Sequence, residues 1–137
     1  MALEKSVYTI ILNKEKRFLL LSPSNHNVPW VLPGGHQEEG EDDKETLRRE
    51  LSEEIGIKEF KLVDGFSRVN RYVNRKGNDR YIVVYLATID DGTEIELSHE
   101  HDNYIWANLE DGLQKLDHEN WRKIVRGAYE YLSISTH

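Results

Sequence analysis

Glutamates gathered on one predicted helix are the residues of this chain best suited to chemistry. Glu50, Glu53 and Glu54 lie within five consecutive residues, directly after Arg49. At about 3.6 residues per turn, their side chains fall within roughly 100° of one another. Like charges at this spacing destabilise a helix, but a divalent cation would neutralise them, and oxygen-only ligands suit magnesium, manganese or calcium. The spacing favours a metal site over the alternative, a solvated acidic face.

The residues around these carboxylates predict how they are positioned. Asp42 followed by Glu45 is a capping-box pattern, and Gly56 can adopt the left-handed conformation that ends helices, so residues 42–55 are expected to be helical. Gly34 and Gly35 precede the helix and would let a backbone carbonyl approach a metal, although an ordinary turn would use the same residues.

The stretch from residue 35 to residue 57 resembles the signature of the Nudix hydrolases. That signature is a glycine, five residues, a glutamate, seven residues, Arg-Glu-aliphatic, one residue, Glu-Glu, one residue and Gly-aliphatic. Every position is matched, by Gly35, Glu41, Arg49, Glu50, Leu51, Glu53, Glu54, Gly56 and Ile57. The resemblance implies an α/β fold, an α/β/α sandwich with a mixed β-sheet between helices. It also implies metal-dependent hydrolysis of a phosphoanhydride in a nucleoside diphosphate linked to another group.

The resemblance implies metal ligands as well. Glu50 and Glu54 match the usual metal-binding carboxylates, Glu53 matches a third that binds directly or through water, and the Gly34 carbonyl matches a backbone ligand. Mg²⁺ is the expected cofactor, with Mn²⁺ as the alternative.

Other residues are expected to brace the site or to catalyse. Glu41 and Arg49 match residues that brace the loop and the helix, and Arg49 is expected to orient a carboxylate through a bidentate hydrogen bond. The general base differs among Nudix subfamilies, so Glu50, Glu53 and Glu100 all remain candidates.

Glu100 lies outside the signature, in the sequence Ser98-His99-Glu100-His101. Several Nudix enzymes have a metal-binding or catalytic glutamate on a loop at this point, which favours a functional role over an ordinary exposed loop residue. The two histidines suggest zinc only weakly, because no third ligand accompanies them.

A run of cations is a candidate phosphate clamp. Residues 68–80 hold Arg68, Arg71, Arg75, Lys76 and Arg80, and such a cluster in an acidic protein suits an anionic substrate. A charged, exposed hairpin is an equally good explanation for the two cations at the turn.

Aromatic residues could stack a nucleobase, although aromatics at strand spacing are more often part of a core. The substrate-binding candidates are His36, Arg68, Arg71, Tyr72, Arg80 and Tyr104.

A second, narrower resemblance concerns the substrate. Gly40-Glu-Asp-Asp, Asp64-Gly-Phe and Leu97-Ser-His-Glu-His are similar to motifs of the asymmetric diadenosine tetraphosphate hydrolases, and His36 fits a histidine of that group. That group typically has lysine where this chain has Gly34, whereas Pro-Gly-Gly is commoner among nucleoside triphosphate pyrophosphatases. The expected substrate is therefore a dinucleoside polyphosphate or a (deoxy)nucleoside triphosphate, with ADP-ribose or another nucleotide sugar as a further alternative.

Composition limits the classes of function. The chain has 137 residues, 38% of them hydrophobic, no cysteine and a net charge of −7. This length suits one Nudix domain over residues 1–137. The negative charge disfavours nucleic-acid binding, and the absence of cysteine excludes disulfides and thiolate metal sites. With no secretory signal and no apolar run of about 20 residues, we expect a cytoplasmic protein without membrane association.

The main alternative to an enzyme is a nucleotide-binding Nudix domain that acts as a sensor. Such a domain would be expected to lose charged residues of the signature, and here they are all present.

Hydrophobic patterning predicts the elements that must position these residues. Strands are expected at 6–12, 17–23, 30–32, 61–75, 80–89 and 104–108, with turns at 13–16, 76–78 and 91–92. Two main helices are expected, at 42–55 and at 118–132.

Overall fold

The computed structural model describes residues 4–23 and 29–135. Its elements, in chain order, are β1 (Glu4–Leu12), β2 (Phe18–Pro23), β3 (Gly34–His36), α1 (Asp43–Ile55), β4 (Lys61–Val73), β5 (Asp79–Thr88), β6 (His101–Ala107), α2 (Leu109–Lys115) and α3 (Glu119–Ser135). They form a six-stranded sheet in the order β4-β5-β1-β2-β6, with β3 also paired to β1.

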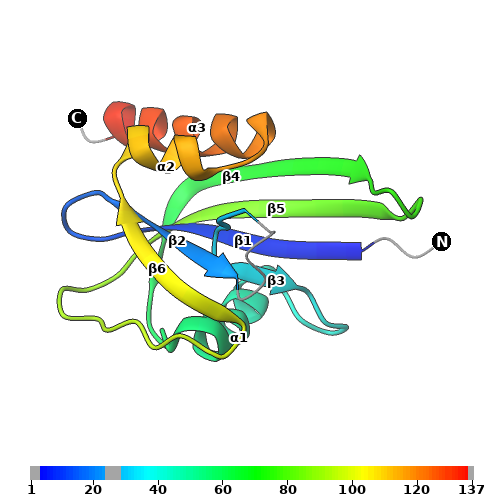
Figure 1. Cartoon of the computed structure of the whole chain (residues 1–137), viewed down its shortest axis with the longest axis horizontal. Coiled ribbons are helices and arrows are strands. Elements are labelled where there is room, and N and C mark those ends of the chain that lie inside the picture. The colour runs from blue at the N-terminus through cyan, green and yellow to red at the C-terminus, as the bar shows by residue number, and fades with distance from the viewer. Residues whose placement is uncertain (1–3, 24–28, 136–137) are drawn as a thin grey trace.

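The sheet is mixed and lies between two layers of helix. β1 and β5 are parallel, whereas the other strand pairs are antiparallel. Helix α1 covers one face, and α2 and α3 cover the other (Figure 1). The expected α/β/α sandwich is confirmed.

The central strands supply a hydrophobic core to both layers. Ile10 of β1 and Leu20 of β2 belong to the cluster that packs against α3, whereas Ile11 and Leu21 belong to the cluster that packs against α1. Successive side chains of a strand point to opposite faces, so strands buried on both faces are mostly apolar, although β1 also buries Ser6 and Thr9. These strands therefore fix both helical layers.

The prediction of a strand at residues 30–32 is wrong. The glycines that follow form the strand β3 instead. Val31 makes only an isolated bridge to Leu21. Gly34 pairs with Tyr8 of β1 at a φ of 143°, and a Cβ there would lie 2.2 Å from the Val7 carbonyl oxygen. Only glycine permits so close an approach. The pattern of hydrophobic residues does not predict a strand of this kind.

The sequence also underestimated the number of helices, because α2 was not expected. Its N-cap is Asn108, whose side chain accepts a hydrogen bond from the Asp111 backbone N–H at 2.8 Å. The other expected elements are present, with ends displaced by up to three residues.

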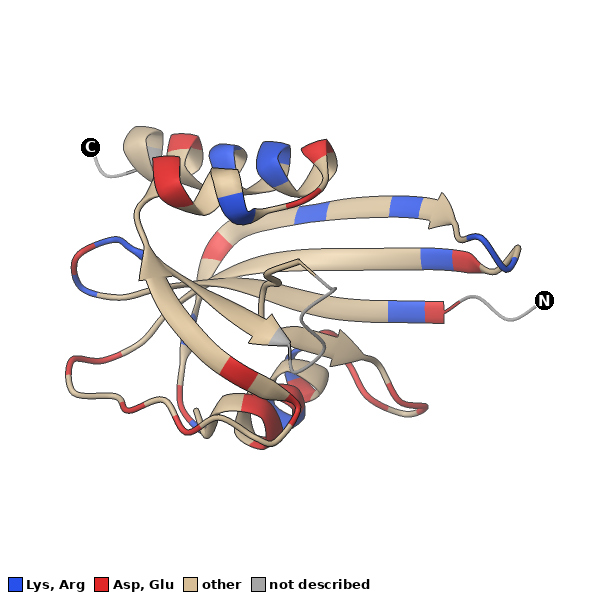
Figure 2. Cartoon of the chain, viewed as in Figure 1, with Lys and Arg blue, Asp and Glu red and all other residues tan. Residues whose placement is uncertain are grey.

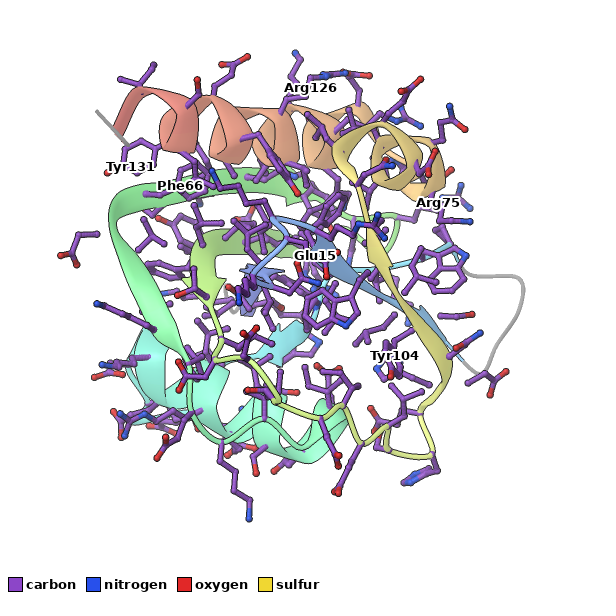
Figure 3. The ribbon with its side chains drawn as sticks, turned by 90° about the vertical axis from the view of Figure 1, so that its left-hand side faces the viewer. Glu15, Phe66, Arg75, Tyr104, Arg126 and Tyr131 are labelled. Atoms are coloured by element: carbon purple, nitrogen blue, oxygen red, sulfur yellow. The ribbon has the colours of Figure 1, made fainter. Side chains whose placement is uncertain are left out.

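The Asp64-Gly65-Phe66 stretch attaches α3 to the sheet. It lies in an irregular part of β4, where the pairing with β5 shifts register. The Tyr131 hydroxyl of α3 donates a hydrogen bond to the Asp64 carbonyl at 2.5 Å, and the Tyr131 and Phe66 rings are 5.7 Å apart (Figure 3). Gly65 has a φ of 85°, and a Cβ there would collide with the Tyr131 hydroxyl. This motif therefore has a structural explanation.

No helix among residues 4–23 and 29–135 is long and apolar enough to cross a membrane.

The predicted capping box of α1 is confirmed. The Asp42 side chain accepts from the Glu45 N–H at 2.8 Å, the Glu45 side chain accepts from the Asp42 N–H at 3.1 Å, and Gly56 ends the helix at a φ of 72°. The carboxylate helix therefore has well-defined ends.

We predict that Asp42→Ala lowers the free energy of unfolding by about 1 kcal/mol, the usual effect of losing an N-cap acceptor. Asp42→Asn keeps the acceptor and should lose less. Urea denaturation of both variants tests this, and equal losses would show that the cap acceptor contributes nothing.

Candidate active site

The carboxylates of α1 face a cleft that four segments of the chain build together. β1, β3, α1 and the loop before β6 contribute to it, and acidic residues gather on α1 and the loops beside it (Figure 2). The lining residues are Tyr8, Gly34, Gly35, His36, Glu50, Glu53, Glu54, Ser98, His99 and Glu100. We call this the carboxylate cleft. All the predicted metal ligands thus line one cleft.

Glu54 is held at both of its carboxylate oxygens. Its Oε1 accepts a hydrogen bond from the Gly34 N–H at 3.0 Å, and its Oε2 lies 3.1 Å from His101 Nε2. An ionised carboxylate only accepts hydrogen bonds, so Nε2 carries the proton. Both side chains are nearly buried, with exposed fractions of 11% for Glu54 and 8% for His101. Glu54 is therefore fixed in orientation before any ligand binds.

Glu50 lies against the glycine backbone of β3. A Cβ on Gly35 would lie only 2.5 Å from the Glu50 carboxyl carbon, which explains the glycine at this position. Burial raises the pKa of Glu50, and the nearby Glu54 raises it further, although a hydrogen bond from Arg49 acts in the opposite direction. A cation bound here would favour the ionised form of Glu50.

Arg49 connects the loop after β3 to α1. Its Nε and Nη2 donate a bidentate pair of hydrogen bonds to Glu41, at 2.8 and 3.1 Å. Nη2 also donates to the His36 carbonyl at 2.8 Å, and Nη1 donates to Glu50 at 2.9 Å. The bond from Arg49 is the main reason that the pKa of Glu41 falls to about 2. A single guanidinium therefore sets the geometry of two carboxylates and one loop.

The loop that carries Glu100 is attached to the last turn of α1. The backbone N–H groups of Glu96 and Ser98 donate to the Ile55 and Glu54 carbonyls, both at 2.9 Å. One ligand atom from each of Glu54, Glu100 and His101 lies within 4.8 Å of the others. The structure thus brings Glu100 to the carboxylates across about fifty residues of sequence.

Glu53 is the most accessible carboxylate of the α1 group. Its side chain is 62% exposed and lies 3.6 Å from Arg49 Nη1. It lines the same cleft, but it is less tightly held than Glu50 or Glu54.

An aromatic pocket adjoins the carboxylate cleft. It is lined chiefly by Trp30 and Trp121, and it shares Tyr8, Gly34 and Glu54 with the cleft. We call it the indole pocket. A mostly apolar pocket that adjoins a polar cleft suits a nucleobase with phosphates attached.

Tyr72 lies in a further hollow beside the indole pocket. This hollow also contains Asn70 and shares His118 and Trp121 with the indole pocket. Tyr72 of β4 is therefore placed to contact a substrate that extends beyond the first base.

His36 lines the cleft, and Arg80 is linked to it through Ser6. Arg80 Nη2 donates to the Ser6 hydroxyl at 3.3 Å, and the same hydroxyl lies 3.5 Å from His36 Nδ1. Arg80 Nη1 is 3.5 Å from a Glu4 carboxylate oxygen, and its buried Nε has no hydrogen-bond partner among the described residues. The unpaired donor of Arg80 is therefore enclosed by the fold.

Four of the expected substrate-binding residues line none of these hollows: Arg68, Arg71, Arg80 and Tyr104. Arg71 pairs with Asp79 on the opposite face of β4 from Tyr72. Arg68 lies over the Phe66 ring at 4.3 Å. Tyr104 is on β6, opposite Leu21 (Figure 3). Neighbouring side chains of a strand point to opposite faces, so Arg71 and Tyr72 are separated. Their closeness in the sequence could not show this separation.

Sequence reasoning missed Tyr8 and underrated His101. Tyr8 lies in a strand whose other residues are predicted to be buried in the core. No sequence pattern marks Tyr8 as a residue of the site. His101 was considered only as half of a weak zinc pair, whereas the structure places it against Glu54.

Comparisons with known proteins agree with this geometry. The NUDIX domain family model matches residues 2–127. The asymmetrical bis(5'-nucleosyl)-tetraphosphatase of Rattus norvegicus is 36% identical over 123 residues, which is 88% of this chain and 83% of the rat protein. Nucleoside triphosphatase NudI of Escherichia coli is 29% identical over 90 residues, covering 60% of this chain and 63% of that protein.

A solved structure is similar over nearly the whole chain. A binary complex of a Caenorhabditis elegans Ap4A hydrolase superposes with a TM-score of 0.86 at 28% identity, covering 95% of this chain and 98% of that one. The chain therefore belongs to the Nudix family. It is a hydrolase that acts on acid anhydrides in phosphorus-containing compounds.

We predict that Arg49→Lys lowers kcat/KM by about 10²-fold, because lysine cannot reproduce the bidentate fork and small displacements of catalytic groups cost about this much. Steady-state kinetics measures the effect. Arg48→Lys is the matched control, since Arg48 is an exposed neighbour. Equal activities of the two variants would contradict the bracing role of Arg49.

Proposed function

We propose that this chain is a magnesium-dependent pyrophosphohydrolase that cleaves a phosphoanhydride bond of a dinucleoside polyphosphate. The observation that carries the proposal is the junction of the carboxylate cleft with the indole pocket, which share Tyr8, Gly34 and Glu54. A nucleotide can lay its base in the pocket and its phosphates in the cleft.

The donor atoms of the cleft fit a hard divalent cation. Carboxylate oxygens dominate it, and oxygen-only sites suit Mg²⁺ or Mn²⁺. Glu50 and Glu54 would hold the ion, with Glu53 and the Gly34 carbonyl as further ligands. Burial disfavours the ionised form of Glu50 and raises its pKa, and a bound cation would offset that effect. A bound ion would neutralise phosphate charge and polarise the phosphoanhydride.

The chain's own residues would then orient the substrate and move a proton. His36, which lines the cleft, would contact phosphate oxygens, and Arg80, which donates to Ser6 behind it, would add positive charge on that side. Glu100 is exposed and lies near Glu54, and we assign it as the base that accepts the proton of the attacking water. Glu50 is less suited to this step because Arg49 occupies one of its oxygens.

A substrate with two bases is favoured over a triphosphate for two reasons. The indole pocket and the hollow around Tyr72 meet at Trp121, which offers aromatic surface beyond a single base. The similarity to asymmetrical tetraphosphatases also spans more of the chain than the similarity to NudI. Gly34 in place of lysine is the observation that keeps a nucleoside triphosphate as the second candidate.

A substrate panel with Mg²⁺, resolved by chromatography, tests the proposal. The panel contains diadenosine tetraphosphate, (deoxy)nucleoside triphosphates and ADP-ribose. We expect diadenosine tetraphosphate to have the highest kcat/KM and to give ATP and AMP. Monophosphate and pyrophosphate from a triphosphate as the best substrate would favour the second candidate. No turnover with either Mg²⁺ or Mn²⁺ would point to a sensor domain.

We further predict that two carboxylate substitutions have different effects. Glu54→Gln should weaken Mn²⁺ binding by about tenfold or more and abolish turnover. Glu100→Gln should lower kcat by about 10²-fold, the scale of general-base catalysis, with Mn²⁺ affinity close to that of the unsubstituted protein. Electron paramagnetic resonance titration and single-turnover kinetics measure the two quantities.

The control for both variants is Glu59→Gln, because Glu59 is exposed and lies outside the cleft. Loss of Mn²⁺ affinity in Glu100→Gln as large as that in Glu54→Gln would make Glu100 a metal ligand instead of the base.

A further inference from the structure

Tyr8 occupies the boundary between the two parts of the site. It is the aromatic residue that lines both the carboxylate cleft and the indole pocket. Its ring makes an edge-to-face contact with Trp121, with centroids 5.4 Å apart and planes at 83°. A nucleotide that extends from the indole pocket into the carboxylate cleft would therefore run alongside Tyr8, Gly34 and Glu54, which line both.

The Tyr8 side chain is partly buried, and its hydroxyl is a hydrogen-bond donor. Within the described part of the chain, it makes no hydrogen bond, although buried phenols usually find a partner. Arg80, Glu54, Tyr72 and Glu50 are the charged or titratable groups that act on it. Burial is the main cause that raises the pKa of Tyr8, so the group remains a protonated donor at neutral pH.

Backbone geometry explains why Gly34 and Tyr8 occur together at this place. The asymmetric diadenosine tetraphosphate hydrolases, which this chain resembles, typically have lysine at the position of Gly34. Here a Cβ on Gly34 would lie 2.2 Å from the Val7 carbonyl oxygen and 2.8 Å from Tyr8 Cδ1. No lysine side chain can leave the backbone at this position while β1 and β3 are paired as they are. The Tyr8 ring occupies that space instead.

We propose that the Tyr8 hydroxyl donates a hydrogen bond to the phosphate nearest the nucleoside whose base lies in the indole pocket. Tyr8 is then a substrate-binding residue that aligns the phosphate chain between the aromatic pocket and the carboxylates. This inference rests on the proposed function, because it assumes that a nucleotide spans both hollows.

The competing explanation is that Tyr8 only supports Trp121 through its ring. Tyr8→Phe separates the two, because it keeps the ring contact and removes the hydroxyl alone. Tyr129→Phe is the matched control, since it also removes a phenol hydroxyl, one that donates to the Lys16 carbonyl and lies outside both hollows.

The experiment compares ligands that differ only in the phosphate. Binding of AMP and adenosine, and of GMP and guanosine, is measured by NMR titration of the full-length chain with EDTA present. For Tyr8→Phe we expect the affinity for the better-bound monophosphate to fall by about tenfold, the usual effect of losing a hydrogen bond to a charged group. Affinity for its nucleoside should not change, and Tyr129→Phe should bind all four ligands as the unsubstituted protein does.

Three outcomes would overturn the proposal: unchanged affinity for the monophosphates in Tyr8→Phe, an equal loss for monophosphate and nucleoside, or no binding of any ligand by the unsubstituted protein. The second of these would show that the residue acts through packing. Because the assay needs neither turnover nor metal, failure of the substrate panel and failure of the Tyr8 assignment are distinguishable.

Discussion

The hydrogen bonds that fix Glu54 join three parts of the fold that are distant in the sequence. The Gly34 N–H from β3 and the His101 ring from β6 meet the Glu54 carboxylate from α1. A nearly buried carboxylate is costly unless its oxygens are satisfied, so this contact requires β3, α1 and β6 to be correctly placed. The position of the loop that carries Glu100 also depends on Glu54, because the Ser98 backbone N–H donates to the Glu54 carbonyl.

Arg49 adds a second constraint at the other end of the carboxylate group. By contacting Glu41, Glu50 and the His36 carbonyl, it attaches the loop after β3 to the helix. Packed carboxylates repel one another, and the fold opposes this repulsion with fixed donors and not with flexible surface charges. Such fixed donors preorganise a site for a cation and for phosphate chemistry.

Strand β1 connects the chemistry with recognition. Its interior side chains contribute to both cores, while Tyr8, near its middle, reaches the carboxylate cleft and the indole pocket. A rigid central strand is a precise support for a ligand contact. The close pairing of Gly34 with this strand is also where the chain departs from the lysine of the group that it resembles.

Regular local patterns allowed the sequence by itself to predict the carboxylate helix, its cap at Asp42 and its end at Gly56, whereas the class of chemistry was implied by the resemblance to the Nudix signature. Helical periodicity and capping depend on residues a few positions apart, so they can be read without a fold. Only the tertiary structure decided four other features. These are the pairing of β3, the contact of His101 with Glu54, the exposure of Tyr8 to both hollows and the separation of Arg71 from Tyr72. Each depends on which strand pairs with which, and on the face a side chain occupies, and those are set by contacts between residues far apart in the chain.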